Sequence, residues 1–324
     1  MELDLKDRKI LAELEMNARI THAELGKVVG LSKQVVKYRI ERLEKENLIQ
    51  GYNAIVDLSK LGEVIYVIYL KLIKISSVQE KVWMKAIEKN TNVLGVGKNA
   101  GHWDMTFAIR CKNNQELDKI FKEISSGKSD RIKEKLITGE IESVYINLGL
   151  LHKGKKVEFE TSEAQENIFI DETDKKIINY LSNNCRISLL DLSEKLGLSP
   201  NGAKNRIKQL EIKKIIIGYK TKINYEKIGY LHFRVFLHLN KFNKELYNKI
   251  KSFLKSKENV ESVSRYIGYA DVDFRCYSKN IVELYQFISD IKDKFLQEII
   301  EVNSMPIFSW EKIIYYKSTS TKIS

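Results

Sequence analysis

Polar side chains that can contact DNA bases and phosphates are grouped in one short stretch of the sequence. It holds Ser32, Lys33, Gln34, Lys37 and Tyr38. Glutamine can bind adenine through two hydrogen bonds, lysine can reach guanine or a phosphate, and a serine at a helix start can hold a phosphate. The chemistry expected here is contact with double-stranded DNA in the major groove. The alternative is an ordinary charged surface helix.

A second stretch with the same chemistry holds Ser199, Asn201, Lys204 and Asn205. Residues 199–214 contain five basic side chains and one acidic, against five and three in residues 32–47. Charge therefore gives no reason to treat the second stretch as inactive, although one of the two could serve only as scaffold. Arg39 and Arg206 could contact phosphate or pair with acids inside their own domain.

A different chemistry is expected at two glycine-rich turns, one with Gly101 and Asp104 and the other with Gly268 and Asp271. The backbone N–H groups of such a turn could hold a carboxylate, and the aspartate could hold an ammonium group. An amino-acid effector would fit. The alternative is a hairpin turn in which glycine takes a positive φ and aspartate caps the backbone.

Short helices must position the DNA-contacting residues. Residues 4–15 have helical periodicity, and Thr21 with Glu24 forms a capping-box pattern at the start of a second helix. Gly30 suits the following turn, and Ser32 suits the N-cap of a basic third helix. Residues 48–56 follow as a strand or wing. Three short helices and a wing predict a winged helix-turn-helix domain.

The next segment alternates strands and helices in the order βαββαβ, which predicts a ferredoxin-like domain with its helices on one face of an antiparallel sheet. The expected strands are 64–72, 93–98, 105–111 and 141–147, and the expected helices are 78–89 and 114–125. We expect the open faces of two such sheets to pair, within one chain or between two, because a large exposed apolar face is unfavourable in a monomer. The side chains expected on these faces are Val67, Tyr69, Phe107, Val235, Leu237 and Phe274.

The whole unit occurs twice, with Asp7 aligned to Asp174 at an offset of 167 residues. Identical pairs include Gly30/Gly197, Arg39/Arg206, Tyr52/Tyr219 and Asp104/Asp271. The second copy is expected to place strands at 231–239, 260–266, 272–277 and 299–303. We expect an insertion in the first copy near residues 127–135, before its last strand.

Composition is that of a soluble globular protein, with 43% hydrophobic and 30% charged residues and a net charge of +12. Cys111, Cys185 and Cys276 lack metal-ligand spacing and predict neither a metal site nor a disulfide framework. No signal peptide or membrane-spanning run is visible. We therefore expect a cytoplasmic, nucleoid-associated protein that needs no cofactor.

The segment from Leu31 to Glu44, the Gly-Tyr pair that follows it and the Gly-x-x-Asp turn resemble the Lrp/AsnC family of transcriptional regulators. The resemblance covers nearly the whole chain twice. It implies an α+β fold with two winged helix-turn-helix domains and two ferredoxin-like effector domains in tandem. The expected division is 1–60 and 171–227 for DNA binding, 61–151 and 228–317 for the ferredoxin-like domains, 152–170 for a linker and 318–324 for a tail.

The resemblance further implies a small-molecule effector, often an amino acid, and dimers that assemble further. Family members usually carry one copy, so a tandem chain can form an intrachain pseudo-dimer. Asn47 and Lys214 stand where the family often has glycine. Gly202 and Ala203 replace Val35 and Val36, so the second recognition helix packs more thinly.

Two other functions share parts of this pattern. Sirohaem decarboxylases have the same architecture in paired or fused copies, but they need basic and histidine side chains for tetrapyrrole carboxylates. The five histidines here, at 22, 102, 152, 232 and 238, do not recur between copies. A nucleoid protein that coats DNA would show affinity nearly independent of sequence and steeply dependent on salt.

Overall fold

The structure is a computed structural model that describes residues 2–152, 156–163, 165–313 and 316. Its first winged helix-turn-helix unit consists of α1 Leu5–Met16, α2 His22–Val29, α3 Lys33–Lys45 and β1 Ile49–Val56. Thr21 and Glu24 form the predicted capping box at the start of α2. Ser32 caps α3 by accepting the N–H of Val35. Gly30 takes a left-handed conformation (φ 67°) in the turn, which costs glycine no steric strain.

The second unit repeats the first, with α6 Glu172–Asn183, α7 Leu189–Leu196, α8 Pro200–Ile212 and β7 Ile216–Ile223. Its helices begin after the N-caps Asp171, Ser188 and Ser199. Each cap accepts a backbone N–H from the first turn of its helix. The predicted helix-turn-helix pattern is therefore present in both copies.

The connection from recognition helix to wing is also the same in both copies. Asn47 has φ 53° and Lys214 has φ 54°, so both adopt the left-handed conformation that glycine favours. Asparagine tolerates this region better than most residues. A lysine there is strained by about 1–2 kcal/mol. The absence of glycine therefore leaves the path of the chain unchanged and adds strain, mainly at Lys214.

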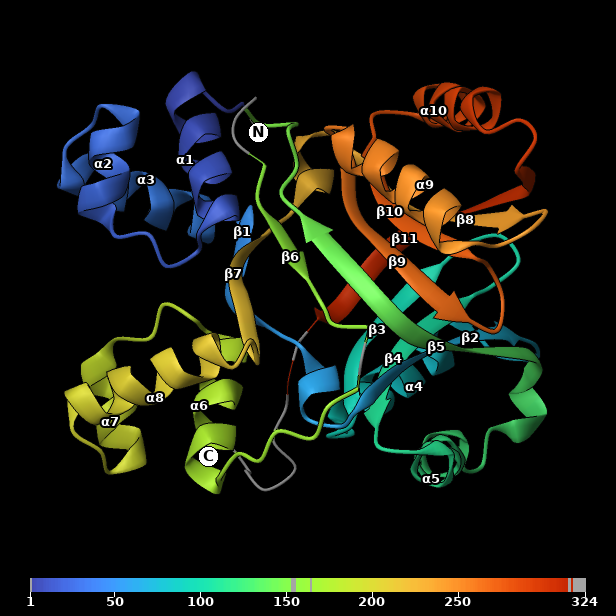
Figure 1. Cartoon of the computed structure of the whole chain (residues 1–324), viewed down its shortest axis with the longest axis horizontal. Helices are drawn as coiled ribbons and strands as arrows, with labels where there is room; N and C mark the ends of the chain where they lie inside the picture. Colours follow the sequence, from blue (N-terminus) through green and yellow to red (C-terminus); the bar gives the residue numbers. More distant parts are fainter. Residues whose placement is uncertain (1, 153–155, 164, 314–315, 317–324) are drawn as a thin grey trace.

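The two winged units are held together by an antiparallel pair, β1 with β7. Figure 1 shows this two-stranded ribbon between the upper and lower units, on the side of the molecule away from α5 and α10. One hydrophobic cluster runs through both units and includes Leu14, Leu25, Ile177 and Leu181. The units therefore share a core.

The remaining strands form a barrel. The first copy contributes β2 Val64–Leu72, α4 Ser77–Lys89, β3 Val93–Asn99, β4 Met105–Cys111, α5 Asn114–Ser125 and β5 Ile132–Ile146. The second contributes β8 Leu231–Leu239, α9 Lys244–Ser256, β9 Val260–Ile267, β10 Val272–Ser278, α10 Ile281–Lys294 and β11 Ile299–Ile313. Both copies thus follow the predicted βαββαβ order.

Strand pairing joins the two copies edge to edge. In the described part of the chain the order is β2-β4-β3-β11-β8-β10-β9-β5, and β5 pairs back with β2. The contacts between copies are β3 with β11 and β5 with β9. The helices lie on the outside of the closed barrel, and the winged units sit together at one side (Figure 1). The two copies therefore form a pseudo-dimer within one chain.

The side chains expected on the paired sheet faces were only partly correct. Val67 and Tyr69 do face the barrel interior, where they pack with Trp103, Phe236 and Met305. The other four were assigned to the wrong face: Phe107, Val235, Leu237 and Phe274 pack under the helices instead. The interior residues of β8 are Arg234 and Phe236, which alternate with Val235 and Leu237 because successive side chains point to opposite faces.

The last strand of each copy is longer than predicted, and the expected insertion near residues 127–135 is wrong. β5 starts at Ile132 and β11 at Ile299, a separation of the same 167 residues that relates the copies.

Three short 3₁₀ turns precede strands: η1 Leu58–Lys60, η2 Ser129–Arg131 and η3 Tyr225–Ile228. Within residues 152–170, the short strand β6 Glu158–Glu160 pairs with β5. The expected tail, 318–324, lies outside the described residues.

Candidate nucleic-acid interface

The outer face of α3 carries the residues selected for DNA contact. Lys33, Gln34, Lys37 and Tyr38 are all exposed, and Tyr38 keeps 67% of its surface free. The inner face is formed by Val36, Ile40 and Leu43, which are buried. Ser32 is exposed as well, but its hydroxyl already accepts the Val35 N–H at 3.3 Å. Ser32 therefore acts mainly as the cap of α3.

The outer face of α8 has the same arrangement with different chemistry. Asn201, Lys204 and Asn205 are exposed, above a buried face of Ala203, Ile207 and Leu210. The Ser199 hydroxyl accepts the N–H of Gly202 at 3.0 Å. Both recognition helices therefore present hydrogen-bonding and cationic groups outward from a closed apolar base.

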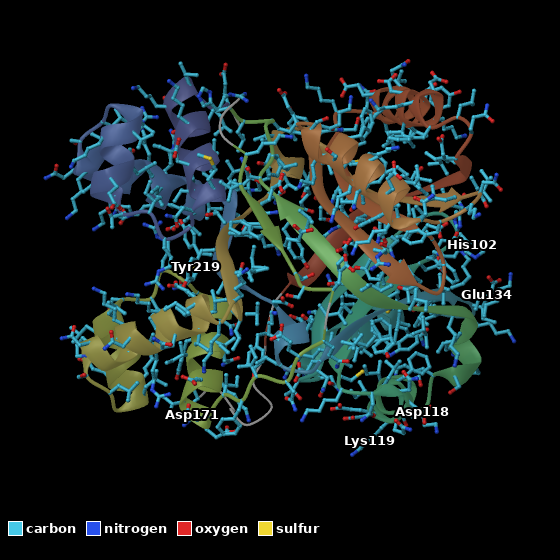
Figure 2. All side chains as sticks on the ribbon, viewed as in Figure 1. His102, Asp118, Lys119, Glu134, Asp171 and Tyr219 are labelled. Atoms are coloured by element: carbon cyan, nitrogen blue, oxygen red, sulfur yellow. The ribbon has the colours of Figure 1, made fainter. Side chains whose placement is uncertain are left out.

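Arg39 and Arg206 are held by acids of their own units. Arg39 donates to Asp4 at 2.7 Å and to Asp7 at 2.8 Å. Arg206 makes the same two contacts, at 2.8 Å each, with Asp171 and Asp174. Figure 2 shows Asp171 at the start of α6, in the lower unit. Of the two alternatives, the structure favours positioning of the recognition helix over phosphate contact.

A cross-copy contact that sequence reasoning missed aligns the two units. Arg19 lies over the ring of Tyr219, 5.1 Å from its centre, and Arg186 lies over Tyr52 at 5.0 Å. Arg186 also donates to the carbonyl of Ala18 at 2.9 Å. Tyr219 is seen between the two units in Figure 2. The sequence did hold a sign of this contact, because the same arginine and the same tyrosine occur at matching positions in both copies.

The same contact leaves a basic opening between the units. Arg19, His22, Lys33 and Arg186 line a cavity there. Burial lowers the pKa of His22, and the nearby positive charges of Arg186, Lys37 and Lys33 lower it further. The local potential is therefore positive, as expected where a phosphate backbone passes.

The two glycine turns adopt the geometry of backbone-capping turns. Gly101 has φ 97° and Gly268 has φ 116°. The Asp104 carboxylate accepts the N–H of Leu72 at 2.7 Å and pairs with Lys71 at 3.1 Å. Asp271 accepts the N–H of Leu239 at 2.8 Å. Both carboxylates thus already have protein partners, which is the pattern of the hairpin alternative.

Aromatic residues surround a cavity of about 270 Å³ beside these turns. His102, Trp103, Phe236 and Tyr269 line it, and they come from both copies. The imidazole of His102 lies 3.1 Å from Glu134, and Figure 2 shows both on the side of the barrel away from the winged units. The turns therefore lie next to a space that a small molecule could enter.

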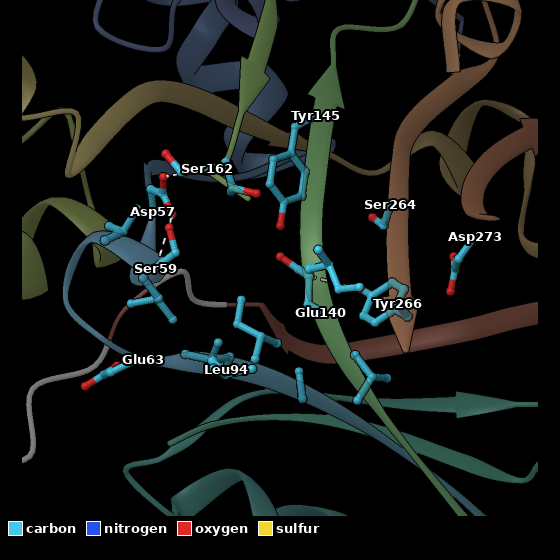
Figure 3. Close-up of a pocket in the computed structure, with 18 of the residues that line it drawn as sticks. Asp57, Ser59, Glu63, Leu94, Glu140, Tyr145, Ser162, Ser264, Tyr266 and Asp273 are labelled. Carbon is cyan, nitrogen blue, oxygen red and sulfur yellow. Dashed lines mark hydrogen bonds between the residues drawn. The ribbon is translucent and has the colours of Figure 1, made fainter. Parts of the chain in front are cut away.

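A second cavity, of about 280 Å³, lies at the opposite end of the barrel (Figure 3). It is bordered by the 3₁₀ turn η1, by Thr161, Ser162, Glu163 and Gln165, and by strands of both copies. Glu140, Tyr145, Tyr266 and Asp273 contribute polar groups to it. The sequence did not single out Glu140 because its environment is built by Tyr266 of the other copy.

Features of a nucleophilic or metal-dependent enzyme are not evident in the described ranges. Burial raises the pKa of Cys111 and of Cys185 to about 12, and also raises that of Cys276. These thiols are thus poor nucleophiles at neutral pH. Within the residues that the structure describes, no group of three His, Cys, Asp or Glu side chains could hold a metal ion. None of the described helices combines the length and apolar composition that a membrane span requires.

Comparison with known families matches both helix-turn-helix units. Residues 3–50 match a family described as winged helix-turn-helix DNA-binding, and residues 170–211 match the AsnC-type helix-turn-helix domain.

Known regulators match this chain over a length close to that of one copy. HTH-type transcriptional regulator PH0045 of Pyrococcus horikoshii is 37% identical over 123 residues, which cover 38% of this chain and 79% of the relative. HTH-type transcriptional regulator FL11 of Pyrococcus furiosus is 28% identical over 124 residues, covering 38% and 81%.

Solved structures of one protein match the fold of nearly the whole chain. The siroheme decarboxylase NirDL aligns with a TM-score of 0.63 over 97% of this chain and 94% of its own, at 11% sequence identity. That likeness concerns the fold alone. The helix-turn-helix matches and the identity to the regulators decide the assignment: the chain belongs to the Lrp/AsnC family of helix-turn-helix transcriptional regulators, with the family's unit present twice.

Proposed function

We propose that this DNA-binding regulator recognises an asymmetric operator, with each copy contacting its own half-site. The observation that carries the proposal is the strand pairing of the two copies within one chain, through β1 with β7 and through the closed barrel. A single chain therefore presents two recognition helices. In helix-turn-helix dimers the half-sites lie about one helical turn apart, and identical helices give a palindrome.

The two recognition helices differ at the exposed positions. Gln34 corresponds to Asn201, Tyr38 to Asn205 and Lys33 to Pro200, whereas Lys37 and Lys204 are alike. Side chains with different reach and different donors contact different bases. The half-sites should therefore share a lysine contact and differ elsewhere.

Selection of bound sequences from a random DNA pool tests this proposal. We expect unlike half-sites for the intact chain. Gln34→Ala should relax specificity in one half-site only, at about 1–3 kcal/mol for a bidentate contact. Lys204→Ala should weaken all sequences and reduce the salt slope by about 1. A perfect palindrome would contradict the intrachain arrangement. Unchanged binding after Lys204→Ala with Asn205→Ala would mean that the second copy does not contact DNA.

We also propose that a small molecule of the amino-acid type modulates this regulator at the turns of Gly101 with Asp104 and Gly268 with Asp271. Support comes from the exposed glycine backbones and the adjacent aromatic cavity. A panel of amino acids should change the melting temperature or assembly of the protein, and Asp104→Asn should remove that response with basal DNA binding intact. If no amino acid has an effect, these turns are structural only.

An enzyme remains the second candidate because the whole-chain fold resembles a siroheme decarboxylase. We infer that the chain is not one. His102 is exposed and pairs with Glu134, while His232 is buried and stacks on Tyr277 at 4.3 Å. These histidines belong to separate environments. Titration with sirohaem followed by ultraviolet-visible spectroscopy separates the two functions, since a shifted and saturable Soret band would support the enzyme.

The proposed location is the cytoplasm, in association with the nucleoid, and further assembly of the pseudo-dimer into oligomers is part of the proposal. Sequence-tolerant DNA coating is the remaining alternative. It predicts equal affinity for selected and random DNA at every salt concentration. A regulator should instead bind the selected operator about 10³-fold or more tightly than random DNA at physiological salt.

A further inference from the structure

The cavity at the winged-unit end of the barrel has an apolar side and a polar side. The apolar side is formed by Ile65, Leu94, Ala108 and Ile141. The polar side is shown in Figure 3, where the Glu140 carboxylate and the Tyr145 hydroxyl turn into the space facing Ser162. Small-molecule sites usually combine an apolar lining with a few polar groups in this way.

Most acids around the cavity are neutralised by the protein itself. Glu63 pairs with Arg110 at 2.8 Å, and Glu163 pairs with Lys244 at 3.0 Å. Asp273 pairs with Arg234 at 2.5 Å. These groups are already stabilised, so a ligand is not needed to balance them.

Glu140 differs from these acids. Its carboxylate accepts the hydroxyl of Tyr266 at 3.0 Å, which is a neutral donor. Among the residues that the structure describes, no lysine or arginine forms an ion pair with it. Burial raises the pKa of its carboxyl group, although hydrogen bonds from Tyr266 and Ser143 and the charges of Arg275 and Arg234 act in the opposite direction. A half-buried carboxylate without a direct ion pair is costly to charge, and an ammonium group in contact with it would lower that cost.

The second copy shows what the same module does without this acid. The position of Glu140 is taken there by Ile307, which is 3% exposed. Ala108 corresponds to Arg275, which lines the same cavity from the second copy. Irregular strand register near Glu140, in the pairing of β5 with β9, marks a bulge of the kind that redirects side chains near functional sites. At this position the acid therefore occurs in the first copy only.

We propose that this cavity binds a small amine, whose ammonium group pairs with Glu140 and whose apolar body lies against Ile65, Leu94 and Ala108. The site is separate from the turns at Gly101 and Gly268, which lie at the other end of the barrel. It uses side chains of both copies, so the bound amine stabilises the closed pseudo-dimer. The volume suits a molecule of roughly drug-fragment size.

Three probes of equal chain length test the charge preference: n-hexylamine, hexan-1-ol and hexanoate, titrated into the full chain by calorimetry and followed by thermal shift. We expect n-hexylamine to bind at least tenfold more tightly than either of the others and to raise the melting temperature. Glu140→Gln should weaken amine binding at least tenfold and leave the ligand-free melting temperature equal or higher. Glu134→Gln, an exposed acid on the same strand, should change amine binding less than twofold.

Equal binding of the three probes, or no binding of the amine, would overturn the proposal. An amine affinity that stays the same in Glu140→Gln would also overturn it. If that variant fails to fold, the relative affinities of the three probes for the unmutated protein decide the question. These measurements contain no DNA and involve neither recognition helix. Their failure would therefore leave the proposed operator recognition untouched.

Discussion

Replacing Asp7 by alanine should destabilise the first winged unit far more than the equivalent Asp174→Ala destabilises the second. Asp7 is 1% exposed and receives Arg39 at 2.8 Å and Arg42 at 2.5 Å. Its removal leaves Arg42 with no acidic partner among the residues that the structure describes. Removing one partner of a buried ion pair costs about 3–5 kcal/mol, and because 37% of the Arg42 side chain is exposed we expect the lower part of that range, about 3–4 kcal/mol.

The second unit should lose less for two structural reasons. The Asp174 side chain is 17% exposed and receives only Arg206, which keeps its contact with Asp171. The position of Arg42 is taken by Gln209, so no second arginine loses its partner. The expected loss is about 1–2 kcal/mol, that of one charged hydrogen bond.

Amide hydrogen exchange of the full chain measures both losses locally. Protection of α3 should fall about 10²–10³-fold in Asp7→Ala, and that of α8 about tenfold in Asp174→Ala, since 1.4 kcal/mol is a factor of ten. Glu41→Ala is the control, because its contact with Lys37 at 3.7 Å is exposed and contributes under about 0.5 kcal/mol. Equal losses in the two aspartate variants would refute the argument from burial.

Three further outcomes are expected. Lys214→Gly should raise stability by about 0.5–1 kcal/mol, because strain relief exceeds the added chain entropy, and Asn47→Gly should change stability less; urea unfolding compares them. The pKa values of Asp4 and Asp171 are lowered, first by capping backbone hydrogen bonds and then by an arginine, so their contribution to stability is present above about pH 4 and is lost as pH falls through the lowered folded pKa values. Unfolding midpoints from pH 7 to pH 2 should show this loss, and Asn at both positions should reduce it. Lys37→Ala should weaken binding to every DNA sequence, which salt titrations measure against the unmutated chain.

Local signals predicted the helix starts well. Thr21 and Ser32 occupy the expected caps, and Ser199 caps the corresponding helix of the second copy, because a capping hydroxyl needs only the next three residues. The strands could also be predicted from the sequence. β2 and β8 begin and end with their runs of β-branched and aromatic residues. Such features depend on near neighbours in the chain.

Features that depend on distant neighbours were missed. The interior face of β8 was assigned to Val235 and Leu237, because an apolar run on a strand buried on both sides does not reveal which face meets the helices. Arg19 and Tyr219 meet only because the two units pair. Glu140 gains its environment from Tyr266, which lies in the other copy. The candidate cavity therefore could not be seen without the barrel.

The closed barrel has a consequence for synthesis of the chain. β5 cannot complete its pairing until β9 has been made, and β3 waits still longer for β11. Translation adds about 5–20 residues per second, so the first copy leaves the ribosome with open strand edges for roughly 10 s before its partners emerge. Open edges attract other chains. During that interval, nascent chains on neighbouring ribosomes of one message could exchange strands, and chaperone demand should be highest when only the first copy is complete.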